Sequence, residues 1–532
     1  MVSTTNLTGS GTADSDVLKC FINNTNATDE KKNNFGSKNT ISNRKREFPL
    51  GSSFRQITAA IIANLGTINT GLTMGFSTMA IPQLTKNKNG SIIITNEEAS
   101  WVASLSPVGT QCGCILSACL TDSLGRKRTL LLTYLPAILG WIIIAVAPTI
   151  EWMYIGRILT GLSSGMVGAP SRVYTAEVTQ PHLRGFLSGL ASIGASFGVA
   201  FEYLIGSIYD WRTLAWISSF IPILSVCTTF LLPESPLWLV SSGQKHKCFN
   251  SLKKLRGSTC DVRHEVNILV EFSERHHSNA TLTTKEKLRI IFQSSTLKPF
   301  FILITYFSIY QFSGSNPLIF YTVCILDDYR IKEENQYLLT VISGIMRLIF
   351  TVFGCILMFH IGRRPLTFVS TIGCGITMFI LAIYGLLSEN WKEKGTEPIA
   401  LWIPILSIYL FVVVTSVGYL IVPWVMIGEL YPTEVRGVVG GLTTALCYFF
   451  IFVAVKTYPI LRNWLSVYGP FFIYGAISLL GTIFIYVYLP ETKDKTLQEI
   501  EEYFSGNKQT KILIETKKKP IVIKTKITAN VV

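Results

Sequence analysis

Two short segments of this chain place a glutamate shortly before an Arg-Gly pair. Residues Glu177–Gly185 read EVTQPHLRG, and residues Glu429–Gly437 read ELYPTEVRG. Each segment follows an apolar stretch long enough to cross a bilayer as a helix. Carboxylates and guanidinium groups at helix ends can form exposed ion pairs, each worth only about 0–1 kcal/mol. Several such pairs make a reversible latch, and their repetition in two apolar halves favours an internally duplicated membrane protein, of which transporters are the commonest kind.

Two further motifs recur once in each apolar half. A GRKR motif at 125–128 follows the second apolar run, and a GRR motif at 362–364 follows the eighth. A PESP motif at 233–236 follows the sixth run, and PETK at 490–493 follows the twelfth. The matched order of three motifs in both halves favours a shared role at the helix ends over the ordinary placement of basic residues at a membrane surface.

The charged residues of these motifs form the predicted gating set. Its members are Arg126, Glu177, Arg184, Glu234, Arg363, Glu429 and Arg436. We expect pairs such as Arg126 with Glu177, or Arg184 with Glu234, to hold helix ends together when the protein is closed on the cytosolic side. Such pairs would stabilise one conformation over another without touching a substrate.

The composition is that of a membrane protein. The chain has 532 residues, of which 49% are hydrophobic and 15% charged, and its mean hydropathy is +0.40. Apolar runs of about twenty residues recur, and each can cross roughly 30 Å of hydrocarbon. We therefore predict an all-α membrane protein with twelve transmembrane helices in a 6+6 plan. The predicted helices cover 57–80, 99–120, 130–149, 152–174, 186–208, 213–232, 298–322, 337–358, 366–387, 400–424, 438–460 and 467–489.

Polar segments divide the chain into five parts. Two six-helix bundles are predicted at 55–236 and 297–490, joined by a cytosolic linker with short helices at 237–296. A disordered N-terminal tail covers 1–54, and a cytosolic C-terminal tail covers 491–532. The polar N-terminal region contains no recognisable signal peptide.

The charge distribution predicts the orientation. The net charge is +14, and the basic residues gather in alternate loops, which indicates that both termini are cytosolic. Asn89 lies in a predicted outside loop within Asn-Gly-Ser and is the expected glycosylation site. No basic stripe with interleaved aromatic residues appears, so no nucleic-acid partner is expected. The 11 cysteines lack metal-ligand spacing, so neither a metal nor another cofactor is expected.

The motifs together resemble one known family. GRKR, EVTQPHLRG, PESP, QFSGSN, GRRP, PW with GELYPTEVRG, and PETKDKTLQEIE resemble the sugar-porter family of the major facilitator superfamily. The resemblance covers the whole helical region, and the motif sequences are most similar to those of insect facilitated trehalose transporters and their relatives. It implies a pseudo-symmetric fold whose two bundles rock about a central sugar site, in a multi-pass protein of the plasma membrane.

A sugar site needs amide, hydroxyl and indole groups with an aromatic face. Gln311 and Asn316 lie within about 140° of each other around an α-helix, and Gly314 and Pro317 allow that helix to break. On residue type alone, both amides could equally be contacts between helices. The resemblance assigns Gln311 and Asn316 to sugar hydroxyls and Trp424 to the cavity.

The predicted pocket departs from the family at several positions. Glucose facilitators have paired glutamines in helix 7, a glutamine in helix 5, an asparagine in helix 8, a glutamate in helix 10 and a tryptophan in helix 11. The residues at these positions here are Tyr310 before Gln311, then Ser192, Arg347, Ser416 and Tyr448. Tyr310, Ser192, Arg347 and Ser416 complete the predicted substrate-binding set. The substrate therefore stays open among trehalose, a hexose and a similar polyol.

Two ionisable residues lie inside predicted helices. Arg347 lies within helix 8 and Glu202 within helix 5, and a charge inside a bilayer is by default a functional candidate. Because helices 5 and 8 face each other in this superfamily, we predict that Glu202 and Arg347 interact. In the alternative, Arg347 lines water and Glu202 reaches outward.

The expected function is facilitative uniport of a sugar. The first helix, 57–80, lacks the acidic residue of proton-coupled sugar porters, and no nucleotide-binding motif is present. Glu202 keeps a proton-coupled symporter as an alternative, and the altered pocket keeps a non-transporting nutrient sensor. An enzyme is not expected, because no nucleophile and base are suitably arranged. The expected partners are a small-molecule sugar and membrane lipids.

Overall fold

The computed structural model describes residues 50–85, 92–180, 183, 187, 189–257, 262–279, 290–432, 435–493, 495 and 497–505. These residues are helical apart from turns and short connections, and they belong to one unit, Pro49–Val532. The predicted glycosylation site Asn89 and the predicted gating residue Arg184 lie outside the described residues. So do most of the predicted terminal tails.

The first half contains six membrane-crossing helices. They are α2 (Leu50–Thr85), α3 (Asn96–Leu124), α4 (Arg126–Val146), α5 (Ile150–Val178), α7 (Leu190–Gly206) and α8 (Trp211–Thr229). The starts are set by local capping. At α3 the Thr95 hydroxyl accepts from the Glu98 N–H, and the Thr95 N–H donates to the Glu98 carboxylate at 2.7 Å. This reciprocal pair satisfies two helix-end donors that would otherwise lack partners.

The second half has six crossing segments, two of them broken. The unbroken ones are α15 (Glu333–His360), α16 (Arg363–Glu393), α19 (Arg436–Leu465) and α20 (Gly469–Tyr488). The broken ones are α13 (Ser294–Tyr310) with the π-helix η2 (Gln311–Ser315) and α14 (Asn316–Asp328), and α17 (Trp402–Val417) with α18 (Val422–Leu430). Within the described residues, eight helical stretches are long and apolar enough to cross a membrane by themselves. Together the described helices form the twelve predicted segments, so the all-α prediction is confirmed.

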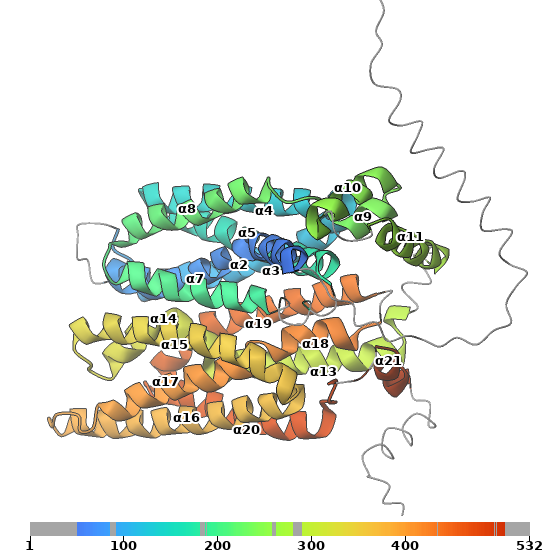
Figure 1. The fold of residues 1–532 in the computed structure, drawn as a ribbon. Helices are drawn as coiled ribbons and strands as arrows, with labels where there is room; N and C mark the ends of the chain where they lie inside the picture. Colours follow the sequence, from blue (N-terminus) through green and yellow to red (C-terminus); the bar gives the residue numbers. More distant parts are fainter. Residues whose placement is uncertain are drawn as a thin grey trace, which may run out of the picture. The chain divides into compact units, whose positions relative to one another are not determined.

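Short helices gather at one end of the bundles. Between the halves lie α9 (Pro236–Ser241), α10 (Lys245–Arg256) and α11 (Val262–Asn279), and α21 (Leu497–Ser505) follows the last crossing. All four lie at the same end in Figure 1. Arg126 and Arg363 begin α4 and α16 at this end, which we call the motif end. The other end, where Thr85 ends α2, is the far end.

Small residues let the helices of the first half approach closely. A Cβ added at Gly71 of α2 would lie 2.0 Å from the Ala195 carbonyl oxygen on α7. One added at Gly113 of α3 would lie 2.1 Å from the Leu162 carbonyl oxygen on α5. Helices inside a membrane associate through this kind of close packing, because hydrocarbon gives them no hydrophobic reason to associate.

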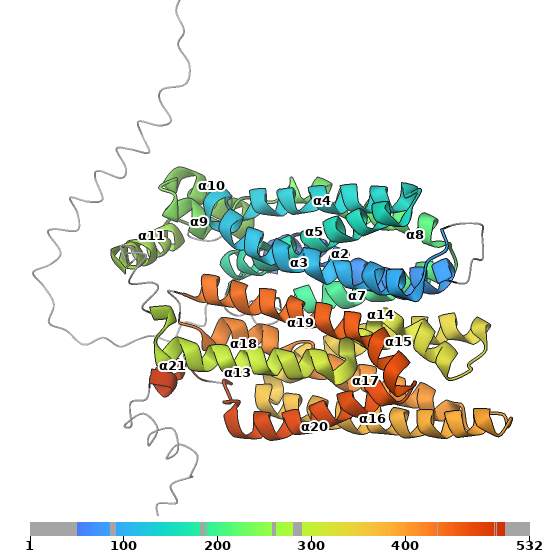
Figure 2. The ribbon, with the colours of Figure 1, turned by 180° about the vertical axis from the view of Figure 1, so that it is seen from behind.

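The two halves meet along three pairs of helices: α2 with α14, α3 with α19, and α7 with α15. Figure 2 shows α3 beside α19, and Figure 1 shows α7 beside the yellow α14 and α15. Three of the polar contacts across this interface lie toward the far end, and a fourth joins the Ser196 hydroxyl of α7 to the Thr351 hydroxyl of α15 at 2.9 Å. Thr78 and Tyr203 both donate to the Ile319 carbonyl, the latter at 2.8 Å, and the Lys456 ammonium donates to the Ser100 hydroxyl at 2.7 Å.

Candidate functional site

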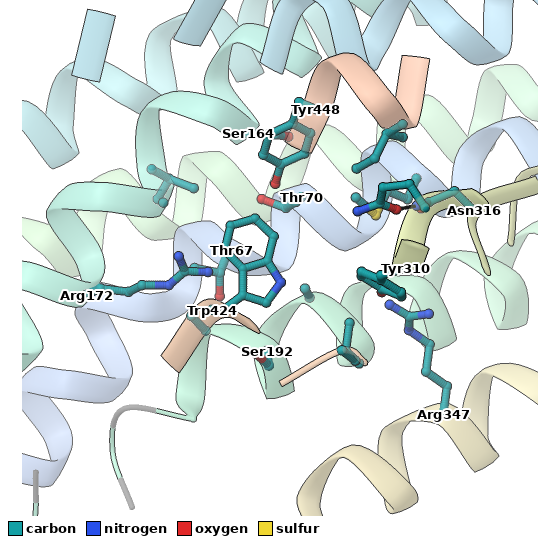
Figure 3. A pocket seen from close by; sticks show the side chains of 18 residues that line it. Thr67, Thr70, Ser164, Arg172, Ser192, Tyr310, Asn316, Arg347, Trp424 and Tyr448 are labelled. Atoms are coloured by element: carbon teal, nitrogen blue, oxygen red, sulfur yellow. Dashed lines mark hydrogen bonds between the residues drawn. The ribbon is translucent and has the colours of Figure 1, made fainter. Parts of the chain in front are cut away.

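A cavity of about 80 Å³ lies between the two halves. It is lined by 18 residues from α2, α5 and α7 on one side, and from the broken α13–α14 segment, α15, the α17–α18 break, α18 and α19 on the other. Figure 3 shows the side chains converging on the indole of Trp424. Ligand pockets usually measure roughly 300–1,000 Å³, so the cavity is constricted in this conformation and must widen to admit a sugar.

The break after α13 places two amides in the cavity. Gly314 adopts φ 89°, and a Cβ there would lie 2.8 Å from the Tyr474 ring, so both its backbone and its surroundings require glycine. The π-helical pattern relates residues five positions apart. Gln311 and Asn316 are brought into contact, with the Asn316 amide donating to the Gln311 carbonyl oxygen. An α-helix would have left them on diverging directions.

Gln311 also forms a hydrogen bond to α19, another helix of the second half. Its amide nitrogen donates to the Cys447 sulfur on α19 at 3.1 Å. Both Gln311 and Asn316 are buried and line the cavity. The pair can exchange its mutual hydrogen bond for bonds to ligand hydroxyls, because each amide has both donors and an acceptor.

Trp424 reaches the cavity because the tenth segment breaks just before it. Gly418 ends α17 where a Cβ would lie 2.4 Å from the Leu366 carbonyl oxygen, and α18 begins at Val422. The indole packs against Phe307 at 5.1 Å between ring centroids. The Arg172 guanidinium of α5 lies 4.7 Å from the indole centroid, so this stack joins the two halves across the cavity.

The other predicted substrate-binding residues divide into two groups. Tyr310, Ser192 and Arg347 line the cavity, and Figure 3 shows the Arg347 guanidinium directed toward the Tyr310 ring. Ser416 is not among the described residues that line it. Its hydroxyl donates to the Val412 carbonyl of its own helix at 2.7 Å.

The predicted contact between Glu202 and Arg347 is wrong for this conformation. Glu202 is fully buried inside the first half, where its carboxylate accepts from the Ser218 hydroxyl at 2.9 Å. Gly75 makes room for it, since a Cβ there would lie 2.8 Å from the Glu202 Cβ. The helices α7 and α15 do pack together as expected, but Glu202 lies on the side of α7 that faces away from the cavity.

At the motif end of the first half, Arg126 and two glutamates form a network. The Arg126 guanidinium pairs with the Glu177 carboxylate through two bonds of 3.0 and 2.9 Å. Glu234 accepts from the backbone N–H groups of Arg126 and Lys127 at 2.9 and 3.0 Å. It thereby satisfies the start of α4, where a carboxylate also complements the helix dipole. The Ser235 hydroxyl donates to Glu177 and closes the network.

The second half repeats this network residue by residue. Arg363 pairs with Glu429 at 2.7 Å, and Thr492 donates to Glu429 at 2.6 Å. Glu491 accepts from the backbone N–H groups of Arg363 and Arg364 at 3.1 and 2.9 Å. The duplicated motifs therefore build duplicated structure, and the predicted pairing of Arg126 with Glu177 is present.

A glycine makes each of these networks possible. Gly125 and Gly362 have φ of 92° and 105°. A Cβ at either would lie within 3 Å of the capping carboxylate, at 2.8 Å from Glu234 and 2.9 Å from Glu491. Arg436, the remaining described arginine of the gating set, donates to the Tyr431 carbonyl at 3.0 Å. The Arg126–Glu177 and Arg363–Glu429 ion pairs each stay within one half.

Sequence reasoning missed Arg172 as a cavity residue. It lies near the end of the predicted helix 152–174, where a basic residue is easily assigned to the membrane surface. It missed Ser235 and Thr492 as well, although both follow the glutamates of the matched motifs. Reading the pairs PES and PET as one repeated unit would have included them.

The comparisons with known proteins agree with this geometry. Residues 20–504 match the family described as Sugar (and other) transporter. The chain is 31% identical over 469 residues to the facilitated trehalose transporter Tret1 of Apis mellifera ligustica, covering 88% of this chain and 92% of that one. It is 32% identical over 455 residues to the Tret1-2 homolog of Drosophila sechellia, covering 85% and 92%.

This chain belongs to the sugar transporter family. Its fold is that of the major facilitator superfamily, as in the proton:xylose symporter XylE bound to 6-bromo-6-deoxy-D-glucose, with a TM-score of 0.68, 21% identity, and 85% of this chain and all of that one covered. The partially occluded inward-open form of XylE from E. coli gives a TM-score of 0.66 at 21% identity, with 84% and 100% covered. The sugar transporter described here is a multi-pass membrane protein, and its duplicated networks lie at the ends of the two halves of that fold.

Proposed function

We propose that the protein carries a sugar or similar polyol down its concentration gradient by alternating access. The observation that carries this proposal is the cavity between the halves, where the Gln311–Asn316 amide pair and the Trp424 indole converge. These are the groups a hydroxylated ring requires. Relatives named as facilitated trehalose transporters make trehalose and hexoses the first candidates.

The far-end contacts suit a state that is closed to the outside. We infer that the motif end is cytosolic, because it carries the basic motif residues and the positive-inside bias places such residues there. Thr78, Tyr203 and Lys456 then join the halves on the outer side of the cavity. Opening outward would require all three contacts to break, while the ion pairs at the motif end stay within their own halves.

Uniport is favoured by the absence of acid in the cavity. Among the described residues that line it, none is Asp or Glu. The buried Glu202 is held by Ser218 inside the first half, away from the substrate groups. Proton coupling needs a carboxyl group whose protonation alters substrate binding or the conformational equilibrium, and Glu202 is the remaining candidate for the second of these roles.

Tracer uptake into proteoliposomes tests the proposal. We expect labelled trehalose, glucose or another polyol to enter until the internal and external concentrations are equal, and an imposed proton gradient to leave that end point unchanged. Accumulation above the external concentration, driven by a proton gradient, would establish a symporter instead. Saturable binding with no flux would indicate a sensor.

The orientation has its own test. We propose a plasma-membrane protein with both termini cytosolic and with Asn89 in an outside loop. Epitopes at both termini should be detected in intact cells only after permeabilisation, and Asn89→Gln should remove the glycan. Labelling of either terminus without permeabilisation would overturn this topology.

A further inference from the structure

The charges of the cavity exceed what a neutral sugar requires. Arg347 from α15 and Arg172 from α5 both line it, and among its eighteen described lining residues no carboxylate opposes them. A cation within a membrane protein is unfavourable unless it is hydrated or paired. We propose that the preferred substrate is a polyol that bears a carboxylate, as a sugar acid does, and that Arg347 binds this carboxylate. This inference rests on the proposed function and names the substrate class of the same cavity.

Arg347 is buried, and its guanidinium has no hydrogen-bond or ion-pair partner among the described residues. The residue is 6% exposed, and no described residue accepts a hydrogen bond from its Nε. Within the described part of the chain its guanidinium forms no ion pair, since Glu202 bonds to Ser218 instead. Figure 3 shows the Tyr310 ring beside the guanidinium. A buried donor of this kind is expected to find its acceptor in a ligand.

Another buried arginine in this chain, Arg157, has hydrogen-bond acceptors for all its side-chain nitrogens. Arg157 on α5 is fully buried, and its three nitrogens donate to Val102, Thr73, Ser77 and Ser106 at 2.7–3.0 Å. No comparable set of acceptors surrounds Arg347 among the described residues. The difference indicates that Arg347 does not serve to hold helices together.

Arg347 is better placed than Arg172 to bind a carboxylate. The Arg172 guanidinium already lies against the Trp424 indole at 4.7 Å. Arg347 approaches from the other half beside Tyr310, on the cavity side that also carries Asn316. A planar guanidinium can bind both oxygens of a carboxylate, and the neighbouring amides remain free for the hydroxyls of the same molecule. Arg172 adds long-range attraction for an anion.

Glucose and glucuronate form a matched pair of probes. They share the ring, and a carboxylate in glucuronate replaces the hydroxymethyl group of glucose. We would measure kcat/KM for uptake of each into proteoliposomes by the full chain. We expect glucuronate to be preferred, and Arg347→Gln to lower the glucuronate-to-glucose ratio by about tenfold to a hundredfold, as the loss of a hydrogen-bonded charge predicts.

Two further variants complete the experiment. Arg330→Gln removes one positive charge from an exposed loop position and should leave the ratio unchanged. Arg347→Lys keeps the charge but loses the planar fork, so its ratio should fall between those of wild type and Arg347→Gln. Size-exclusion profiles would identify any variant that fails to fold, and the wild-type preference stands independently of the variants.

The outcomes separate the two claims. Transport of glucose or trehalose with no preference for glucuronate would overturn the anionic substrate and leave the proposed function intact. An unchanged ratio in Arg347→Gln would overturn the role of Arg347. Uptake of neither neutral nor acidic sugars by folded protein would overturn the proposed function, and this inference with it.

Discussion

Two arginines are buried inside helices of opposite halves, and their surroundings differ. Arg157 is 0% exposed and donates four hydrogen bonds that join α5 to α2 and α3. Arg347 is 6% exposed and faces the cavity with its Nε unpaired. The same residue type therefore has two different roles in this protein. A buried charge with every donor satisfied holds a fold together, while one left unsatisfied at a cavity is kept for a ligand.

The largest expected effect separates these two arginines by stability. Arg157→Gln strands several buried acceptors, each costing about 1–3 kcal/mol, so we expect a loss of at least about 3 kcal/mol and little folded protein. Arg347→Gln should cost less than about 1 kcal/mol, because no side-chain hydrogen bond to a described residue is lost. Thermal unfolding in detergent, followed by size-exclusion chromatography, measures both. Equal destabilisation would erase the distinction between them.

The helix-end networks lie between these extremes. Arg126–Glu177 and Arg363–Glu429 are partly buried pairs within single halves. We expect Glu177→Gln or Glu429→Gln to cost about 1–2 kcal/mol, between the values for exposed and buried pairs. The loss should shift the conformational population, so that transport falls while equilibrium binding of sugar persists.

Accessibility of a cysteine introduced at the motif end reports that shift. Gly428 on α18 is a suitable position, since a side chain there would meet no atom within 4 Å. Its labelling rate should change in Glu429→Gln and not in the exposed control Arg330→Gln. Lost binding with an unchanged labelling rate would assign these glutamates to the substrate site instead.

The Gln311–Asn316 pair sharpens the comparison, because each amide is partnered by the other and yet lines the cavity. Gln311→Ala and Asn316→Ala should each weaken sugar binding by about 0.5–1.5 kcal/mol. The double variant should lose less than the sum, since removing one amide also frees the other from its partner. Strict additivity in a binding titration would mean that the two amides do not act as a unit.

The smallest expected effect concerns Glu491, whose partners are backbone N–H groups. Burial alone would raise its pKa, but the N–H groups of Lys493 and Arg364 that donate to it hold the pKa below the usual value. Its stabilising contribution is therefore present above the unfolded pKa of about 4.3 and is lost as pH falls through the folded pKa. We expect wild type to lose thermal stability over that acidic range by up to about 1 kcal/mol more than Glu491→Gln. Parallel stability curves for the two proteins would contradict this.

Much of the fold can be predicted from the sequence, because membrane helices are long and apolar and have charged residues at their ends. The duplicated motifs even predict the contact of Arg126 with Glu177, since both halves repeat the same charges at the same helix ends. The π-helix is harder to foresee. Gly314 indicates a break, but only the packing of Tyr474 and Met378 around it determines its form.

The predicted pair of Glu202 and Arg347 shows where sequence reasoning ends. The predicted packing of α7 against α15 is confirmed. The sequence did not show, however, which neighbouring helix leaves space for the Glu202 side chain. Gly75 leaves space for Glu202 and Ser218 supplies its hydrogen bond, so the carboxylate turns into the first half. Glu202, the partner that the sequence predicts for Arg347, is therefore not in contact with it.

The central claim is that an unpaired arginine in a uniporter receives the charge of its substrate. Uptake of glucuronate into proteoliposomes under an imposed membrane potential tests it most directly, because uncoupled movement of an anion carries current. An inside-positive potential should accelerate glucuronate uptake and leave glucose uptake unchanged. Collapsing the potential with an ionophore should abolish the acceleration. Glucuronate uptake that is indifferent to the potential, or no uptake of it beside active glucose transport, would contradict the account.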